Sequence, residues 1–339
     1  MTTISTIGND RVAGILLRRS TLVSALVVVA ALFAVESLGS RILVSLLTQA
    51  AIVSLLALGV GVLTRISGLV SFGHAAPFGL GAYGAAWALS GGSALPPEAG
   101  LIVVVPLVAA VFFLVGLVVS RLEGIGFSML TLALGQAVFV AVSKFRGLTG
   151  GADGVVVNLP RRLFGLSSDT VQSPYGMLVL SVTAIGLLYV ELRLFELSHL
   201  GRLAVAIREN EERTRFLGYG VRALKAAVFA LSAAVAALGG VLYALYQGFV
   251  SPEILHWSFS GSALIMSILG GASALWGPIA GAFSFFFLRE GLNELTSHWL
   301  AVLGAMLIVV TVAWPTGLSG GVETLLRRLA GAAKRRDTQ

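Results

Sequence analysis

The sequence predicts an all-α polytopic membrane protein with about ten transmembrane segments, some of them short or broken. Composition is the first observation: 57% of the 339 residues are hydrophobic and 12% are charged, whereas charged residues make up about a quarter of an average soluble domain. Segment length is the second, because a helix needs about 20 apolar residues to cross the hydrocarbon core and many runs approach that length. The third is a densely charged stretch between apolar runs, as expected of a loop outside the membrane.

Ten apolar segments are expected to cross the membrane, and their order sets the topology. They lie at residues 21–38, 42–63, 67–90, 101–120, 125–143, 175–192, 224–247, 261–272, 276–290 and 297–314. With the N-terminus inside, 17 of the 23 Lys and Arg residues are cytoplasmic, in agreement with the excess of basic residues in cytoplasmic loops. Both termini are therefore predicted to be cytoplasmic, in a plasma (inner) membrane.

The chain divides into three parts. We expect a cytoplasmic N-terminal segment at 1–20, a transmembrane domain at 21–317 and a basic cytoplasmic tail at 318–339. The apolar run that begins at Thr21 continues to Leu38 without an Ala-x-Ala cleavage pattern, so we expect an uncleaved first span rather than a signal peptide. The net charge of +7 follows from this topology, because the basic residues are spread over loops and chain ends. It does not indicate nucleic-acid binding.

Two predicted segments are interrupted by glycine and proline, one in each half of the chain. The first contains Pro77 among small residues, and in the second Gly271 and Gly277 separate runs too short to cross the membrane upright. Irregular backbone at membrane depth is tolerated only where it is buried in protein or lines a wet cavity. The two breaks therefore predict a substrate path between the halves. Whether residues 261–290 cross twice or form a re-entrant pair stays open.

Polar residues within the apolar segments are candidates for this path. A histidine in a span is costly in hydrocarbon, so His74 is expected to face the bundle or a water-filled path. Gln136 needs a partner outside its own helix, whereas Ser and Thr hydroxyls bond their own backbone carbonyls. The candidate path residues are Ser71, His74, Tyr83, Thr131, Gln136, Met266, Gly270 and Gly271. The alternative interpretation is structural: hydrogen bonds between helices and close packing at glycine.

The charged stretch at 193–225 contains eleven charged residues in 33 positions. Leu203, Ile207 and Leu217 form a loose apolar stripe, and Gly218 suits the C-terminal end of a helix. A helix that lies on lipid favours Lys and Arg on its polar face, whereas the acidic residues here would repel anionic headgroups. We therefore expect a soluble protein partner at this loop. The candidate contact residues are Ile207, Arg208, Glu209, Asn210, Glu211, Glu212, Arg213, Leu217 and Gly218.

Several function classes are disfavoured by what the sequence lacks. The lysines follow Ser143, Leu224 and Ala333, so the chain has no Gly-Lys-Ser/Thr and is not a P-loop ATPase by itself. The absence of cysteine removes thiolate metal sites and cysteine nucleophiles, and the four histidines are too scattered to suggest a metal site. Acidic residues fall near predicted span ends, which disfavours a proton-coupled carrier. We expect no catalytic residue, metal or cofactor in this chain.

The sequence resembles the membrane permease subunit of branched-chain amino acid ABC importers, of the LivM type. The matching segments are GLVSFGHAAPFGLGAYGAA at 68–86, GIGFSMLTLALGQAV at 124–138, LTGGADG at 148–154, the stretch at 207–257, ILGGASALWGPIAGA at 268–282 and the proline-glycine at 315–317. They follow one another in a consistent order. Pro77 departs from the pattern, because another residue is expected at that position.

The resemblance implies a type II importer fold and a role as one of two permease subunits, the other being LivH-like or a second copy. It also implies two cytoplasmic ATPases that bind ATP and Mg, and an external substrate-binding protein, with membrane lipid around the spans. The loop matching 202–220 would form the coupling helix that sits in a groove of the ATPase. The chain is expected to be a transport subunit rather than an enzyme, and to translocate branched-chain or related small amino acids by alternating access.

Two alternatives to this function stay open. Similar permeases carry urea or short amides, so the substrate could differ while the mechanism is the same. The other alternative is a stand-alone secondary carrier or channel, in which the charged stretch is a regulatory surface.

Overall fold

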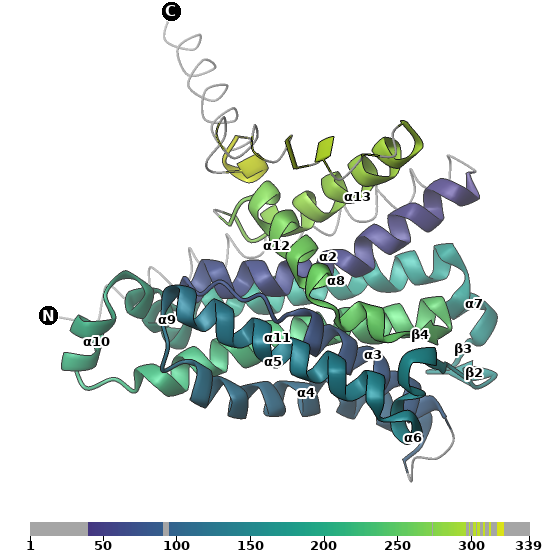
Figure 1. Ribbon diagram of the computed structural model, residues 1–339, viewed down its shortest axis with the longest axis horizontal. Coiled ribbons are helices and arrows are strands. Elements are labelled where there is room, and N and C mark those ends of the chain that lie inside the picture. The colour runs from purple at the N-terminus through teal and green to yellow at the C-terminus, as the bar shows by residue number, and fades with distance from the viewer. Residues whose placement is uncertain are drawn as a thin grey trace, which may run out of the picture.

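The computed structural model describes residues 40–90, 95–272 and 274–295, together with scattered positions between 298 and 321. The predicted span at 21–38, and most of the predicted span at 297–314 and of the tail, lie outside the described residues. The described part is a bundle of helices (Figure 1).

Long helices make up the bundle and short elements connect them. The long helices are α2 (Arg41–Ser67), α3 (Ala75–Leu89), α4 (Pro97–Val119), α5 (Gly124–Lys144), α8 (Pro174–Leu197), α11 (Val221–Gln247), α12 (Trp257–Gly270) and α13 (Gly277–Leu295). The short helical elements are α6 (Arg146–Thr149), η1 (Gly151–Asp153), α7 (Ser168–Gln172), α9 (His199–Glu209), α10 (Glu211–Phe216) and η2 (Pro252–Leu255). Short antiparallel strand pairs join β1 (Val155–Val156) to β4 (Phe249–Val250), and β2 (Arg162–Leu163) to β3 (Leu166–Ser167).

Five of the described helices are long and apolar enough to cross a membrane: α2, α4, α5, α8 and α11. Each matches a predicted span, with ends displaced by no more than five residues. The predicted fold class, an all-α polytopic membrane protein, is confirmed. Helices α3 and α12 have 15 and 14 residues, so they are only about 22 Å and 21 Å long.

Helices α2 and α11 form the centre of the bundle. In the most apolar stretch of each, 78% of the residues are buried, compared with 28% in α4, 22% in α5 and 17% in α8. Helix α11 packs against α2, α3 and α4, and α2 also contacts α8, α12 and α13. The outer helices expose large apolar side chains such as Leu107, Met129 and Leu187. Such faces suit contact with lipid or with another apolar subunit.

Glycines bring the backbones of α3 and α11 into contact. A Cβ atom at Gly240 would lie 1.8 Å from the carbonyl oxygen of Phe78, and one at Gly81 would lie 2.2 Å from that of Ala237. Small residues allow membrane helices to approach this closely. Close packing therefore accounts for much of the glycine pattern in this part of the sequence.

The predicted span at 67–90 is wrong at its start. Helix α2 continues to Ser67, and Gly68 ends it with φ +70°, a left-handed conformation that glycine adopts without strain. Residues 68–74 have no helix or strand, and we call them the first break. Pro77 lies in the first turn of α3, where its missing N–H leaves no helical hydrogen bond unmade. The interruption thus precedes Pro77 and is not caused by it.

Candidate functional site

The first break is held by hydroxyl groups of α5. Thr131 Oγ1 accepts a hydrogen bond from the backbone N–H of Phe72 at 3.3 Å, and Ser128 Oγ donates to the carbonyl of Val70 at 2.7 Å. Gly73 packs so closely that a Cβ atom there would lie 2.3 Å from the carbonyl oxygen of Thr131. Hydroxyl groups of α5 therefore satisfy part of the irregular backbone of the first break.

His74 is fully buried at the end of the first break. Its Nε2 lies 3.1 Å from the hydroxyl of Ser232 in α11, and that hydroxyl donates to the carbonyl of Phe229 at 2.8 Å. The next residue, Ala75, donates its N–H to Ser260 Oγ in α12 at 2.7 Å. Because the Ser232 proton is directed to Phe229, Nε2 is the ring nitrogen that donates, and Nδ1 is left as an acceptor.

Three predicted path residues keep a buried polar atom that bonds to nothing in the described part of the chain: His74 Nδ1, Tyr83 Oη and Gln136 Oε1. Leaving a buried polar group unpaired costs about 1 to 3 kcal/mol. A partner from outside the described residues, such as water, substrate or another subunit, would remove this cost. Ser71 and Thr131, by contrast, hold backbone turns through their hydroxyls.

An apolar cavity of about 310 Å³ lies between α3, α4, α5 and α11. Thr131 and Gly135 from α5, Phe112 from α4 and Phe229 from α11 contribute to its lining. Among the predicted path residues, Thr131 alone lines this cavity, so the cavity does not bring the predicted path residues together. Apart from Thr131, its lining side chains are apolar, so its walls offer no charged partner for the charged groups of an amino acid.

The second break, between Gly270 and Gly277, rests on close backbone contact. Gly271 adopts φ +85°, and a Cβ atom at Gly270 would lie 1.9 Å from the carbonyl oxygen of Gly277. Met266 is buried in a small apolar cluster that α12 shares with α2 and α13. These residues hold α12 and α13 together, and their place along a substrate path stays a prediction.

The charged stretch at 193–225 begins in the last turns of α8 and ends in the first turns of α11, and between them it folds into two helices, α9 and α10. We call residues 198–220 the charged loop. Asn210 divides the two helices, because its backbone is extended (φ −157°) and its Oδ1 accepts from the N–H of Arg213 at 2.8 Å, which caps α10. Ser198 caps α9 in the same way. Gly218 follows α10 with φ +86°, which agrees with the helix end expected there.

Three of the predicted contact residues attach the charged loop to the membrane helices. Ile207 is 3% exposed, the Arg208 guanidinium donates to the carbonyl of Arg65 at the end of α2, and Glu211 forms an ion pair with Lys225 in α11. The side chains of Ile207 and Glu211 are thus held by this chain, and their contact with a partner stays a prediction. Both point inward, because burial and an ion pair satisfy them within this chain.

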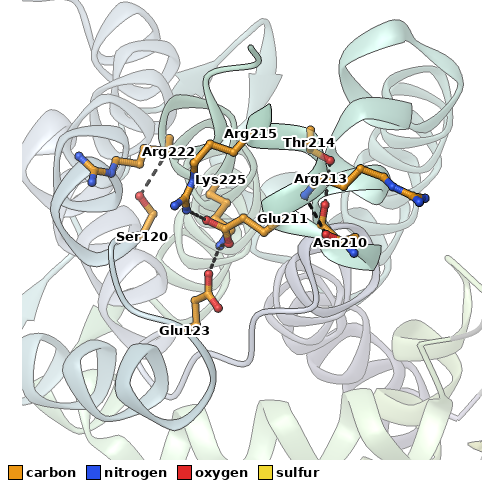
Figure 2. Close-up of polar contacts among 9 residues, drawn as sticks. All are labelled: Ser120, Glu123, Asn210, Glu211, Arg213, Thr214, Arg215, Arg222 and Lys225. Carbon is orange, nitrogen blue, oxygen red and sulfur yellow. Dashed lines mark hydrogen bonds and ion pairs between the residues drawn. The ribbon is translucent and has the colours of Figure 1, made fainter. Parts of the chain in front are cut away.

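Glu211 and Lys225 form the centre of an ion cluster (Figure 2). The Lys225 side chain is 5% exposed, and its ammonium also lies 3.3 Å from Glu123 in the connection between α4 and α5. Arg215 reaches Glu211 at 2.6 Å. Partial burial alone raises the pKa of Glu211, but hydrogen bonds within the cluster and the charge of Lys225 lower that pKa to about 2. Glu211 is therefore ionised at neutral pH, and the cluster joins three elements of the fold.

The opposite face of α10 is open. The side chains of Phe216 and Leu217 are 83% and 71% exposed, and together with Asn210, Glu212 and Arg213 they line a shallow depression. The expected apolar stripe is thus wrong in its last member, because Leu217 points away from the membrane helices. The exposed face combines aromatic, aliphatic and charged groups, a composition typical of protein contact surfaces.

The sequence did not predict which residues hold the first break and the ion cluster in place. Ser232 bonds His74 across 158 positions, and Ser260 bonds Ala75 across 185 positions. Glu123 bonds Lys225 across 102 positions. No local pattern marks contacts at such separations. One signal was present, because Lys225 falls inside the predicted span at 224–247, and a charged side chain in a span needs a partner.

The helices and the charged loop define a multi-pass α-helical membrane protein with an ordered loop outside the spans. The chain belongs to the family described as the branched-chain amino acid transport system permease component, whose model matches residues 42–311. It is 30% identical to the high-affinity branched-chain amino acid transport system permease protein LivM of Escherichia coli (strain K12), over 87% of this chain and 74% of that protein. The LivM protein of Salmonella typhimurium (strain LT2) matches with the same identity and coverage. No solved structure matches the chain.

Proposed function

We propose that this chain is one of two membrane subunits of an ATP-binding cassette importer. It translocates branched-chain or related small amino acids across the inner membrane by alternating access, and it has no enzymatic activity of its own. The second permease is LivH-like, two cytoplasmic ATPases bind ATP and Mg, and an external protein delivers the substrate. Family membership and the likeness to LivM support the substrate class.

The two faces of the charged loop are the observation that carries this proposal. Its inner face is anchored to α11 by Glu211 and Lys225, while its outer face exposes Phe216 and Leu217. A partner bound to the outer face would therefore pull on the membrane helices through the inner face. This is the arrangement that coupling of ATP hydrolysis to helix movement requires.

The substrate path is a separate part of the proposal. His74, Tyr83 and Gln136 have buried polar atoms that need partners, so we assign them to the path or to the contact with the second permease. We assign Ser71, Thr131, Met266, Gly270 and Gly271 to holding the two breaks in shape beside it. The charged loop is placed on the cytoplasmic side with both termini, because this orientation puts most basic residues inside.

Charge reversal on the outer face of the loop tests the proposal. Glu209 and Glu212 are exposed, so a Glu209→Lys, Glu212→Lys variant keeps the inner anchors. Like charges at an interface cost several kcal/mol, so we expect ATPase binding to weaken about tenfold or more. ATPase co-purification and ATP-driven uptake are measured together, after membrane insertion is verified.

Asp169→Lys provides the control, because it makes the same acid-to-lysine reversal once, at an exposed position in α7, at the opposite end of the molecule from α10 (Figure 1). It is expected to retain the ATPases. Normal ATPase binding and uptake by the double charge-reversal variant would rule out the proposed coupling surface.

A further inference from the structure

Arg65 lies in the last turn of α2, where two other parts of the chain meet its guanidinium. Its Nε lies 2.5 Å from Oε1 of Glu196, near the end of α8, and Nη1 donates to the carbonyl of Ala272 in the second break at 3.0 Å. The side chains of Arg65 and Glu196 are 25% and 10% exposed. A planar guanidinium directs its donors at fixed angles, so it holds both acceptors in one geometry.

The backbone of the same residue is bound by the charged loop. The guanidinium of Arg208, in α9, donates to the carbonyl of Arg65. The stem of Arg208 also lies against Gly68, where a Cβ atom would be 2.9 Å from Arg208 Cγ. Figure 1 shows the end of α2 and helix α9 at the same end of the molecule. Arg65 thus stands between the charged loop and the start of the first break.

Three segments therefore contact Arg65: the end of α8, helix α9 and the second break. A fourth, the first break, begins three residues further along the chain. A rigid contact that joins a moving loop to two irregular segments gives them a shared displacement. We infer that Arg65 is a positioning residue that transmits movement of the charged loop to the second break. This inference rests on the proposed function, because it requires a loop that moves with ATP.

Two substitutions separate this role from simple stabilisation. Arg65→Gln removes the positive charge and with it the ion pair to Glu196. Arg65→Lys keeps the charge but loses the planar guanidinium, which bonds Glu196 and Ala272 at the same time. If Arg65 transmits movement, Arg65→Lys has a melting temperature near that of the wild-type protein and still fails to couple. Arg193→Gln is the matched control, since Arg193 bonds the same Glu196 carboxylate at 2.8 Å and is 44% exposed.

The experiment uses the complex purified from its native membrane and placed in liposomes with labelled leucine. We measure the amount of leucine taken up per ATP hydrolysed. Both Arg65 variants are expected to lower this ratio about fivefold or more, while Arg193→Gln leaves it unchanged.

A distance measurement supplies the structural readout. The chain contains no cysteine, so Arg202→Cys in α9 and Ile268→Cys in α12, both exposed positions, give this chain two sites for spin labels and no others. In the otherwise unaltered complex we expect the distance between the labels to change when ATP binds. In the Arg65→Gln and Arg65→Lys backgrounds we expect no change.

Two results would overturn the inference. The first is an unchanged uptake ratio together with label movement in both Arg65 variants. The second is an equal fall of the uptake ratio in Arg193→Gln, because that variant leaves the bond from Arg65 to Ala272 in place. Failure of the proposed function looks different, because the wild-type complex itself would then show no ATP-driven uptake.

Discussion

Lys225 is a buried cation near the start of α11, and its surroundings explain why the charged loop is ordered. Its side chain is 5% exposed and contacts Glu211 and Glu123. A buried charge is tolerated only when it is paired. The chain therefore has to bring α10 and the connection between α4 and α5 to the same point, and this fixes the loop against the bundle.

Removal of the central carboxylate tests this explanation. Glu211→Gln leaves Lys225 buried with only the exposed Glu123 beside it, and we expect the free energy of unfolding to fall by about 3 kcal/mol. Thermal unfolding of the purified protein in mild detergent measures the change. Glu212→Gln, one residue away on the exposed face, should shift the melting temperature little. Equal melting temperatures for the two variants would show that the cluster does not anchor the loop.

The same cluster predicts a dependence on pH. The pKa of Glu211 is lowered from 4.5 to about 2 in the folded protein, so its contribution to stability is complete above pH 4.5 and is lost as the pH falls towards 2. We expect the melting temperature of the wild-type protein to fall more steeply than that of Glu211→Gln over this interval. Parallel curves would mean that Glu211 has the same pKa in the folded and unfolded chains.

At the scale of single residues, the sequence identified the kinds of side chain that matter but not their directions. It singled out Glu211 and Leu217 together as contact residues, yet one faces inward and the other outward. The direction of Glu211 depends on Glu123 and Lys225, which come from other elements of the fold. Gly218 was predictable, because a glycine that ends a helix acts through its own backbone.

At the scale of elements, α3 and α11 are joined through their backbones. Gly240→Ala places a methyl group 1.8 Å from the carbonyl oxygen of Phe78, so the helices must separate, and we expect a loss of about 3 kcal/mol in stability. The yield and melting temperature of the folded protein report the effect. Gly186→Ala in α8 is the control, because nothing lies within 4 Å of a Cβ atom there. A Gly240→Ala protein as stable as this control would contradict the backbone contact.

Five spans were predictable from the sequence because length and hydropathy suffice for helices such as α4 and α8. The start of α3 was not, because residues 68–74 include leucine, valine and phenylalanine as the flanking helices do, and the interruption lies in their backbone conformation. That conformation depends on hydroxyl groups of α5, which supply the hydrogen bonds that a helix would make internally. Short helices at the two breaks are therefore a tertiary feature that hydropathy does not encode.

At the scale of the whole molecule, the charged loop, the ion cluster and the two breaks form one connected system. The loop is anchored to α11 through Lys225 and to α2 through Arg65. Helix α2 leads into the first break, and α11 contacts α3 on the other side of that break. A force applied to the loop is thus passed to the segments proposed to open the path, and this is how ATP hydrolysis in a partner would drive transport.

The dependence of transport on ATP is measured as uptake of labelled leucine into liposomes that hold the complex purified from its native membrane. Liposomes with and without enclosed ATP are compared. We expect uptake only with ATP, by a complex that contains a second permease and ATPases. Equal uptake without ATP, by the chain alone, would contradict the proposed function and indicate a secondary carrier or channel.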